Sequence, residues 1–369
     1  MQNTLEIGDT KAKPGTIEKG SLGGVEIGDG LVAKVPVINV NGLEDGPVLT
    51  VTTAVHGTEV SGLGALWDAI KQIDLNSLKG ALIAIPAANP ISTRLGTYTT
   101  PIDNVNLSGP WYMPTVEQQN ASATQRLAYY INGALEIADY VIDMHSNPLP
   151  SIPFVLTDYE MCKDEKTRNG VKKIAQGYGT TIVNWPRTKA TSIRDICASH
   201  GKPSITAELA GNYLWEEIYK IGSRGILNVM KSINMLEGNP EKQNVDIING
   251  ELVFYGWLFA QRGGFLLAKK KPGEKIEKGE TVIEIVDAYG DLVQNVTMPT
   301  TGYCWSFTGG LNGSHSIPEG TKVYNVEMQP GDGGKMARAA GEAAIIISHG
   351  KQNTTIRLPS KAQKKLDNM

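Results

Sequence analysis

The feature that most constrains the fold is a repeated alternation of strand-like and helix-like segments over roughly the first 240 residues. Residues 48–55 form a β-branched run typical of a buried strand, whereas residues 60–73 place Leu63, Leu66 and Ile70 on one helical stripe. Strands that alternate with helices predict a mixed, largely parallel sheet flanked by helices on both faces, which is the α/β class. The alternation continues through strands at 31–40, 81–85, 140–144, 154–156, 181–184 and 204–208, and helices at 124–137, 164–178, 192–199 and 215–236.

The pattern changes near Gly238. Residues 252–328 show short strands punctuated by glycine and no helical spacing, which predicts a second, small all-β domain. Its hairpin at 271–286 resembles those of biotinyl and lipoyl carrier domains, but the turn at 286–291 has no lysine to carry a prosthetic group. We therefore expect three parts. They are an α/β domain at 1–240, with an N-terminal lead-in at 1–30, a small β domain at 250–328, and a tail at 329–369 whose role the sequence leaves open.

Composition excludes several classes of protein. The net charge of −3 argues against a phosphate-binding surface, so we expect no nucleic-acid partner, and the lysine clusters at 269–271 and 361–365 are interpreted as solvated faces. The three cysteines are far apart, which indicates neither a disulfide framework nor a zinc ribbon. Residues 1–6 lack a cationic and apolar leader, and no apolar run reaches membrane-spanning length. We expect a cytoplasmic protein without a membrane partner; whether it forms a homo-oligomer stays open.

Two histidines follow strand-like segments, and a glutamate lies three residues after the first. His56 comes where the strand 48–55 ends, Glu59 follows it, and His145 ends the strand 140–144. Either histidine alone would more often be satisfied by a backbone carbonyl. In open α/β sheets, however, ligands gather at the carboxyl ends of strands, so all three side chains should lie on one rim. Because imidazole and carboxylate both suit Zn²⁺, the sequence predicts one zinc ion per chain on His56, Glu59 and His145.

A further acid, Glu208, ends the strand 204–208 and should lie on the same rim. Zinc sites that catalyse hydrolysis keep an open position, where the metal lowers the pKa of a water molecule. A carboxylate that does not bind the metal can take the proton from that water and later protonate the leaving amine. We therefore predict that Glu208 is the general base. Asp143, two residues before His145, is expected to orient a ligand rather than to bind the metal.

Together these segments resemble the succinylglutamate desuccinylase/aspartoacylase family, relatives of the zinc carboxypeptidases. The resemblance rests on the ordered set of residues 54–59, 86–90, 142–146 and 206–209 and spans roughly residues 20–328. It implies a zinc carboxypeptidase-like fold, zinc held by His56, Glu59 and His145, and Glu208 as the base. It also implies hydrolysis of the amide bond in an N-acylated amino acid or a related small N-acyl amine.

The chain departs from the family where the substrate carboxylate is expected to bind. The family carries an Asn-Arg pair in this segment, but here Ser108 and Gly109 stand at those positions, close to Asn106. Glycine cannot replace a bidentate arginine clamp, so either the substrate lacks that carboxylate or another cation binds it. We take Asn106, Ser108 and Gly109 as the candidate substrate-binding residues. Candidates for the replacement cation are Arg126, Arg187 and Arg194, and the sequence does not choose among them.

The family's second arginine, which polarises the scissile carbonyl, precedes this segment. Arg94 is the candidate here and would stabilise the oxyanion as a catalytic residue, although Tyr98 can occupy the expected column instead. Two other functions stay open at this point. One is a family member that retains zinc and acts as a binding or regulatory protein, which the missing Asn-Arg pair would explain. The other is a carboxypeptidase acting on short peptides.

Overall fold

In the computed structural model of the chain, the described residues are 3–28, 30–108, 121–307, 322–323, 336, 344–349 and 353–367. By backbone contacts they divide into two compact units. The first comprises residues 1–257, 271–276 and 301–308, and the second comprises 258–270, 277–300 and 309–369.

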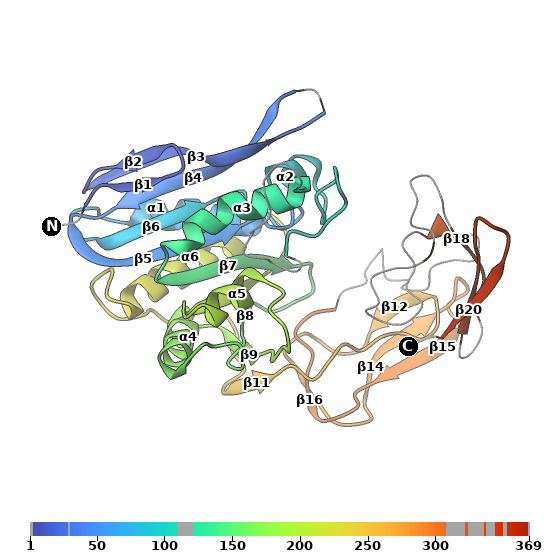
Figure 1. Cartoon of the computed structure of the whole chain (residues 1–369). Helices are drawn as coiled ribbons and strands as arrows, with labels where there is room; N and C mark the ends of the chain where they lie inside the picture. The colour runs from blue at the N-terminus through green and yellow to red at the C-terminus, as the bar shows by residue number, and fades with distance from the viewer. Residues whose placement is uncertain are drawn as a thin grey trace. The chain divides into compact units, whose positions relative to one another are not determined.

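A nine-stranded mixed sheet forms the centre of the first unit (Figure 1). Its strand order is β11-β9-β8-β10-β7-β5-β6-β4-β3. The pairs β11/β9, β9/β8, β10/β7, β7/β5 and β5/β6 are parallel, whereas β8/β10, β6/β4 and β4/β3 are antiparallel. The expected mixed, largely parallel sheet is therefore confirmed. The strands are β3 (Thr16–Glu26), β4 (Val32–Asn41), β5 (Glu44–Thr53), β6 (Lys79–Ile85), β7 (Tyr140–Asn147), β8 (Phe154–Thr157), β9 (Thr181–Asn184), β10 (Ser204–Ala210) and β11 (Glu251–Val253).

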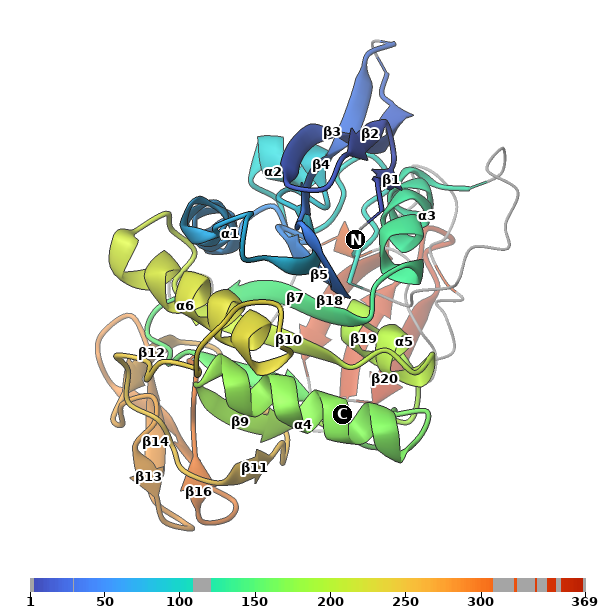
Figure 2. The same ribbon diagram turned by 90° about the vertical axis from the view of Figure 1, so that its left-hand side faces the viewer.

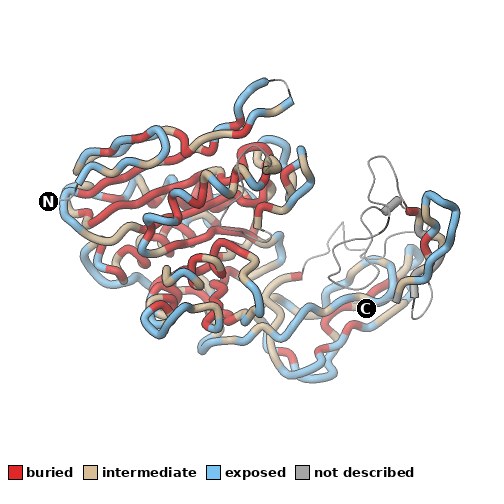
Figure 3. The backbone as a smooth tube through the Cα atoms, viewed as in Figure 1, coloured by how far each residue is buried: buried red, intermediate tan, exposed pale blue. Residues whose placement is uncertain are grey.

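Helices cover both faces of this sheet (Figure 2). They are α1 (Ser61–Gln72), α2 (Pro90–Leu95), α3 (Ala123–Glu136), α4 (Glu165–Tyr178), α5 (Ile193–Ser199) and α6 (Glu216–Ser232). One hydrophobic cluster joins α1, α4 and α6 to the sheet, and a second joins α3 and α5 to it. The buried residues accordingly concentrate in the strands and on the inner sides of the helices (Figure 3). None of the described helices is both long and apolar enough to cross a membrane.

Local sequence signals set the helix ends. Ser122 and Gln125 form a capping box at the start of α3, and the Asp164 side chain accepts the Thr167 amide at the start of α4. The helix α4 then ends at Gly179 in the left-handed conformation. The short helix α2, which the alternation does not predict, begins after Asn89, whose side chain accepts the Ser92 amide, and has a proline in its first turn.

The N-terminal residues contribute strands to the first unit. The hairpin of β1 (Leu5–Ile7) and β2 (Thr10–Ala12) precedes β3, and β3 pairs with β4 along its whole length. Buried Asn39 and Asn41 on β4 donate hydrogen bonds to backbone carbonyls of this hairpin region, including those of Leu5 and Ala12. These amides tie the first residues to the sheet because a buried polar group needs a partner.

The remaining strands form small antiparallel sheets. In the second unit, β12 (Phe265–Ala268), β14 (Thr281–Val286) and β15 (Leu292–Thr297) form one, and β17 (Lys322–Val323), β18 (Ala344–His349), β19 (Asn353–Arg357) and β20 (Gln363–Asp367) form another. The pair β13 (Lys275–Ile276) and β16 (Gly302–Tyr303) belongs to the first unit. The apolar run Ala344–Ile347 of the tail thus lies in the strand β18.

Close packing of α1 against α6 generates a prediction about stability. A Cβ added at Gly222 of α6 would lie 2.6 Å from Ala65 Cβ and 2.9 Å from Met144 Cε. We expect Gly222→Ala to lower the free energy of unfolding by about 1–3 kcal/mol, because the two helices must separate to relieve this overlap. The measurement is urea unfolding followed by circular dichroism.

The matched control is Gly133→Ala in α3, where an added Cβ meets no atom within 4 Å. This change should raise stability by about 0.5–1 kcal/mol, since alanine loses less backbone entropy than glycine in a helix. Equal effects of the two substitutions would contradict the packing argument.

Candidate metal centre and active site

The turn between β5 and α1 holds the first two predicted ligands. The Glu59 amide donates to the His56 carbonyl at 3.0 Å, which closes a four-residue turn just before α1 begins at Ser61. Both ligands therefore lie in the turn between the strand and the helix, not within α1. Ala54, at the end of β5, has a φ of 50°, a strained conformation for a residue with a side chain and one that concentrates at functional sites.

Gly57 lets this turn lie against the chain that follows α2. Its amide donates to the Thr97 carbonyl and to the Ser92 hydroxyl, both at 2.9 Å. A Cβ at Gly57 would lie 2.1 Å from the carbonyl carbon and oxygen of Ser92, so no larger residue fits. The segment 92–98 is therefore fixed to the turn that carries His56 and Glu59.

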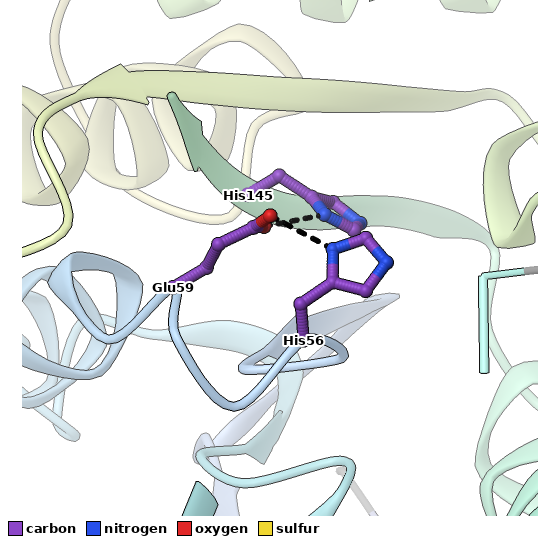
Figure 4. A group of neighbouring side chains, drawn as sticks. All are labelled: His56, Glu59 and His145. Atoms are coloured by element: carbon purple, nitrogen blue, oxygen red, sulfur yellow. Dashed lines mark hydrogen bonds and ion pairs between the residues drawn. The ribbon is translucent and has the colours of Figure 1, made fainter. Parts of the chain in front are cut away.

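The three predicted ligands converge (Figure 4). His56 Nδ1 lies 2.8 Å from Glu59 Oε1, and His145 Nδ1 lies 2.8 Å from Glu59 Oε2. One ligand atom from each residue lies within 4.8 Å of the others, and all three side chains are buried. The sheet brings them together because β5 and β7 are adjacent parallel strands, so their carboxyl ends share one rim. Two imidazoles and a carboxylate form a donor set suited to Zn²⁺.

The outer nitrogens of both histidines also have partners. His145 Nε2 lies 3.0 Å from Asp143 Oδ2, and Thr52 donates to the other oxygen of Asp143 at 2.6 Å. His56 Nε2 lies 3.0 Å from Asn106 Oδ1. These contacts leave the two Nδ1 atoms facing the common centre, the arrangement that orients histidine ligands in metal sites. Asp143 and His145 are two residues apart on β7, so they share a face of the strand.

Electrostatics within the cluster favours an ionised carboxylate. Burial raises the pKa of Glu59, but the charges of and hydrogen bonds from His145 and His56 outweigh it and lower this pKa to about 2. Burial likewise lowers the pKa of His145, yet the neighbouring Asp143 and Glu59 raise it well above its usual value. These shifts describe an ionised Glu59 beside a protonated His145. A divalent cation bound there would take the place of that proton, because a metal-binding histidine is neutral.

Glu208 lies beside His145 in the sheet. The two residues are register partners on the parallel strands β10 and β7, so their side chains leave the same face. Burial raises the pKa of Glu208 to about 7, with the charge of His145 acting in the opposite direction. Asn147 Nδ2 donates to Glu208 Oε2 at 2.9 Å and holds the carboxylate in place. A carboxyl group with a pKa near neutrality is suited to exchange protons at working pH.

The other predicted site residues fall in different places. Asn106 lies beside His56, and its Oδ1 also accepts the Ser108 amide at 2.8 Å. Ser108 is therefore tied to the site through Asn106, whereas Gly109 lies outside the described residues. Arg94 is exposed at the end of α2, and no hydrogen bond or ion pair of its side chain is seen among the described residues. The assignment of Arg94 as a catalytic residue stays a prediction.

Of the three arginines proposed as replacement clamps, Arg194 is the one whose charge is seen to lower the pKa of Glu208. It is buried, donates to Asp195 Oδ1 from Nε and Nη2 at 3.0 and 2.8 Å, and approaches the Thr206 hydroxyl at 3.5 Å. Thr206 is two residues before Glu208 on β10, and the charge of Arg194 acts on Glu208. Arg187 instead stacks 4.0 Å from the Trp185 ring, and Arg126 donates to a backbone carbonyl at the start of α3.

Two neighbours of the site were not singled out as site residues from the sequence. Asn147, the donor to Glu208, could have been found because it ends the strand that carries His145 and lies two residues after it. Tyr98, noted from the sequence as an occupant of the arginine column, stacks on His56 with ring centroids 3.7 Å apart and planes 18° apart. No local pattern predicts this ring contact.

The C-terminal residues match a different family. Residues 309–369 match the C-terminal domain of ribosomal proteins L2, and the large ribosomal subunit protein uL2 of Hyperthermus butylicus is 54% identical over 52 residues. That alignment covers 14% of this chain and 22% of the ribosomal protein. The chain thus spans about a fifth of the length of such curated relatives. The sequence analysis did not foresee this match.

The α/β part of the chain is similar to characterised deacylases. The N-alpha-acetyl-L-2,4-diaminobutyric acid deacetylase of Halomonas elongata is 25% identical over 257 residues, covering 66% of this chain and 71% of that protein. Among solved structures, a succinylglutamate desuccinylase/aspartoacylase from Rhodobacter sphaeroides has a TM-score of 0.67 at 23% identity, covering 78% of this chain and 90% of its own. Product-bound EutE (DoeB) from Ruegeria pomeroyi has a TM-score of 0.70 at 21% identity, covering 82% and 93%.

The family profile named succinylglutamate desuccinylase/aspartoacylase catalytic domain matches residues 45–233, just over half of the chain. This range contains the candidate ligands His56, Glu59 and His145 and the candidate base Glu208. The resemblance inferred from the sequence is thereby confirmed, and with it the carboxypeptidase-like α/β fold. The chain belongs to the succinylglutamate desuccinylase/aspartoacylase family, whose members are deacylases of N-acyl amino acids.

Proposed function

We propose that the chain is a zinc-dependent hydrolase that cleaves the amide bond of an N-acylated amino acid or a related small N-acyl amine. The observation that carries this proposal is the convergence of His56, Glu59 and His145, with Glu208 beside them on the neighbouring strand. The deacetylase from Halomonas elongata acts on an acetylated diamino acid by its name, which supports a small N-acyl substrate.

The residues of this chain divide the chemistry between them. His56, Glu59 and His145 would hold one Zn²⁺, which when bound supplies Lewis acidity and makes a nearby water molecule easier to deprotonate. Glu208 then takes the proton from the attacking water. The same carboxyl group returns the proton to the nitrogen of the leaving amine as the amide bond breaks. Asn147 keeps the Glu208 carboxylate oriented through this cycle.

The nature of the amine depends on the missing clamp. With Ser108 and Gly109 in place of the family's Asn-Arg pair, either the substrate lacks the carboxylate that this pair binds or another cation binds it. A panel for turnover should therefore include acetylated and succinylated amino acids together with monoacetylated diamines that carry no carboxylate.

Metal binding is the first test. We expect purified wild-type protein to bind one Zn²⁺ per chain and His145→Ala to bind none stoichiometrically. Asp143→Asn should bind zinc about 10–100-fold more weakly, because loss of its charge removes the group that orients His145. Elemental analysis and competition with a chelator measure both quantities.

The control is Asp139→Asn. Asp139 immediately precedes β7, the strand that carries Asp143 and His145, and its side chain accepts the Val48 amide of β5, away from the ligands. Its zinc affinity should equal that of the wild type. A wild type without stoichiometric zinc would remove the metal from the proposal.

Glu208 can be tested by its dependence on pH. Its raised pKa means that the carboxyl group is protonated, and hence unable to act as a base, below about pH 7. We expect kcat/KM to rise with pH and then level off, with an apparent pKa at or below about 7, because a bound cation lowers it further. Glu208→Gln should lower kcat by about 10²–10⁴-fold.

In the same pH series, Glu217→Gln on the exposed first turn of α6 is the control and should follow the wild type. Turnover that survives unchanged in Glu208→Gln would remove this residue from the role of base. Zinc binding without turnover of any amide would favour the alternative of a binding or regulatory protein.

We further propose that the tail contacts RNA, a function that the match to ribosomal protein L2 favours over a solvated face. Four exposed basic residues, Arg357, Lys361, Lys364 and Lys365, lie on β19, β20 and the turn between them. Purified large-subunit ribosomal RNA should bind the full chain with an affinity that falls as salt rises.

The test replaces Arg357, Lys364 and Lys365 together by glutamine. The slope of log affinity against log salt concentration should become shallower by about 0.7–0.9 for each RNA phosphate that the variant no longer neutralises. The control replaces Lys269, Lys270 and Lys271 by glutamine and should leave the slope unchanged. Equal slopes for the wild type and both variants would contradict a role of the tail in RNA binding.

A further inference from the structure

A tyrosine lies against the candidate metal centre where a carbonyl-polarising residue is needed. The Tyr98 ring stacks on His56 at a centroid distance of 3.7 Å. The charges of Glu59, His145 and Glu208 all act on its hydroxyl group. The hydroxyl therefore lies within electrostatic range of both Glu59 and Glu208.

The backbone holds Tyr98 in this place. The carbonyl of the preceding residue, Thr97, accepts the Gly57 amide from the turn that carries His56. The Thr97 amide donates to the Ser92 carbonyl, and the Thr97 hydroxyl donates to the Thr99 carbonyl at 2.8 Å. These bonds fix the backbone on both sides of Tyr98, so the stacked ring rests on a supported segment.

The hydroxyl proton of Tyr98 is available for a substrate. Burial and the charge of Glu59 raise the pKa of Tyr98, and a hydrogen bond between its hydroxyl and the Asn106 side chain acts in the opposite direction. Asn106 Oδ1 is already engaged by His56 Nε2 and the Ser108 amide. The tyrosine O–H can then donate elsewhere, and half of the residue is exposed, with 52% of its surface accessible.

We propose that Tyr98 is the catalytic hydrogen-bond donor that polarises the scissile carbonyl and stabilises the oxyanion formed when water attacks. This inference rests on the proposed hydrolase function and deepens it. A reacting carbonyl must lie near both the metal centre and Glu208; the Tyr98 ring lies against the candidate ligand His56, and the charge of Glu208 acts on its hydroxyl. Arg94, the candidate named from the sequence, is exposed and makes no described side-chain hydrogen bond or ion pair. A preorganised donor in such a position stabilises developing negative charge.

The test compares Tyr98→Phe with the wild type. Phenylalanine keeps the ring that stacks on His56 and removes only the hydroxyl. We expect kcat to fall by about 10²–10³-fold, with KM changed less than about threefold and the zinc content unchanged. Tyr98→Arg should recover at least tenfold of the lost rate by supplying another donor. Tyr289→Phe, at a residue 91% exposed, is the control and should behave as the wild type.

A second readout keeps the inference separate from the proposed function. Methylphosphonate carries oxygens arranged tetrahedrally, as in the species formed by attack of water on an acetyl group. Calorimetry of zinc-loaded protein should show at least tenfold weaker methylphosphonate binding to Tyr98→Phe than to the wild type. This measurement applies even if the wild type hydrolyses no amide, a result that would contradict the proposed function alone. Turnover and methylphosphonate affinity both within twofold of the wild type would overturn the role of Tyr98.

Discussion

The site depends on one carboxylate shared by two imidazoles. Glu59 contacts His56 through one oxygen and His145 through the other, each at 2.8 Å, in a buried setting. Burying charged groups costs several kcal/mol for each ion unless partners compensate. The compensation here comes from Asp143, Asn106 and the Ser146 amide, which surround the three side chains. The cluster is therefore stable only if the sheet and its loops position all of these hydrogen-bond partners together.

Strand register is the constraint that positions the side chains of the site. His145 pairs with Glu208 across β7 and β10, and Asp143 shares its face of β7. A slip of one residue in either strand would turn its side chains to the opposite face of the sheet. That opposite face is filled by apolar side chains packed under α1, α4 and α6, including Met144, Ala207 and Leu209. The hydrophobic alternation on these strands thus fixes the register, and the register positions the catalytic groups.

This dependence explains which parts of the site the sequence predicts. His56, His145 and Glu208 each end an apolar strand, and in an open α/β sheet the carboxyl ends of parallel strands meet. Local pattern and topology together therefore predict that these residues lie on one rim of the sheet, and this prediction needs no knowledge of side-chain contacts. The helix α2 escaped prediction because it is only six residues long and depends on the Asn89 cap rather than on periodicity. The strand β3 lies within residues 1–30, and its pairing with β4 makes it an edge of the sheet.

Contacts that depend on loop conformation could not be predicted in the same way. The stacking of Tyr98 on His56 depends on hydrogen bonds from Gly57 and within residues 92–99, and neither composition nor spacing encodes these bonds. The buried pairing of Arg194 with Asp195 is similarly invisible, since adjacent residues on a helix do not ordinarily face each other. The similarity of the tail to ribosomal protein L2 could be found only by comparison with relatives, because the strands of the tail carry no periodic pattern that separates them from other small β segments.

The distribution of charge around Glu208 distinguishes this site from the family pattern. Gly109 stands where the resemblance places the arginine of the Asn-Arg pair, and in our proposal the Tyr98 hydroxyl takes the part of the second arginine; both groups are uncharged. The cation that acts on Glu208, Arg194, donates twice to Asp195, so its charge is largely balanced within the fold. Charged groups attract a ligand over long distances, whereas neutral donors act only at hydrogen-bond range. Recognition by neutral groups such as the Tyr98 hydroxyl therefore depends on the fit of the bound substrate more than on its net charge. The metal ligands and the base lie at the ends of strands, whereas the neutral groups lie in the loops after α2. The neutral groups can therefore change while the metal ligands and the base stay constant.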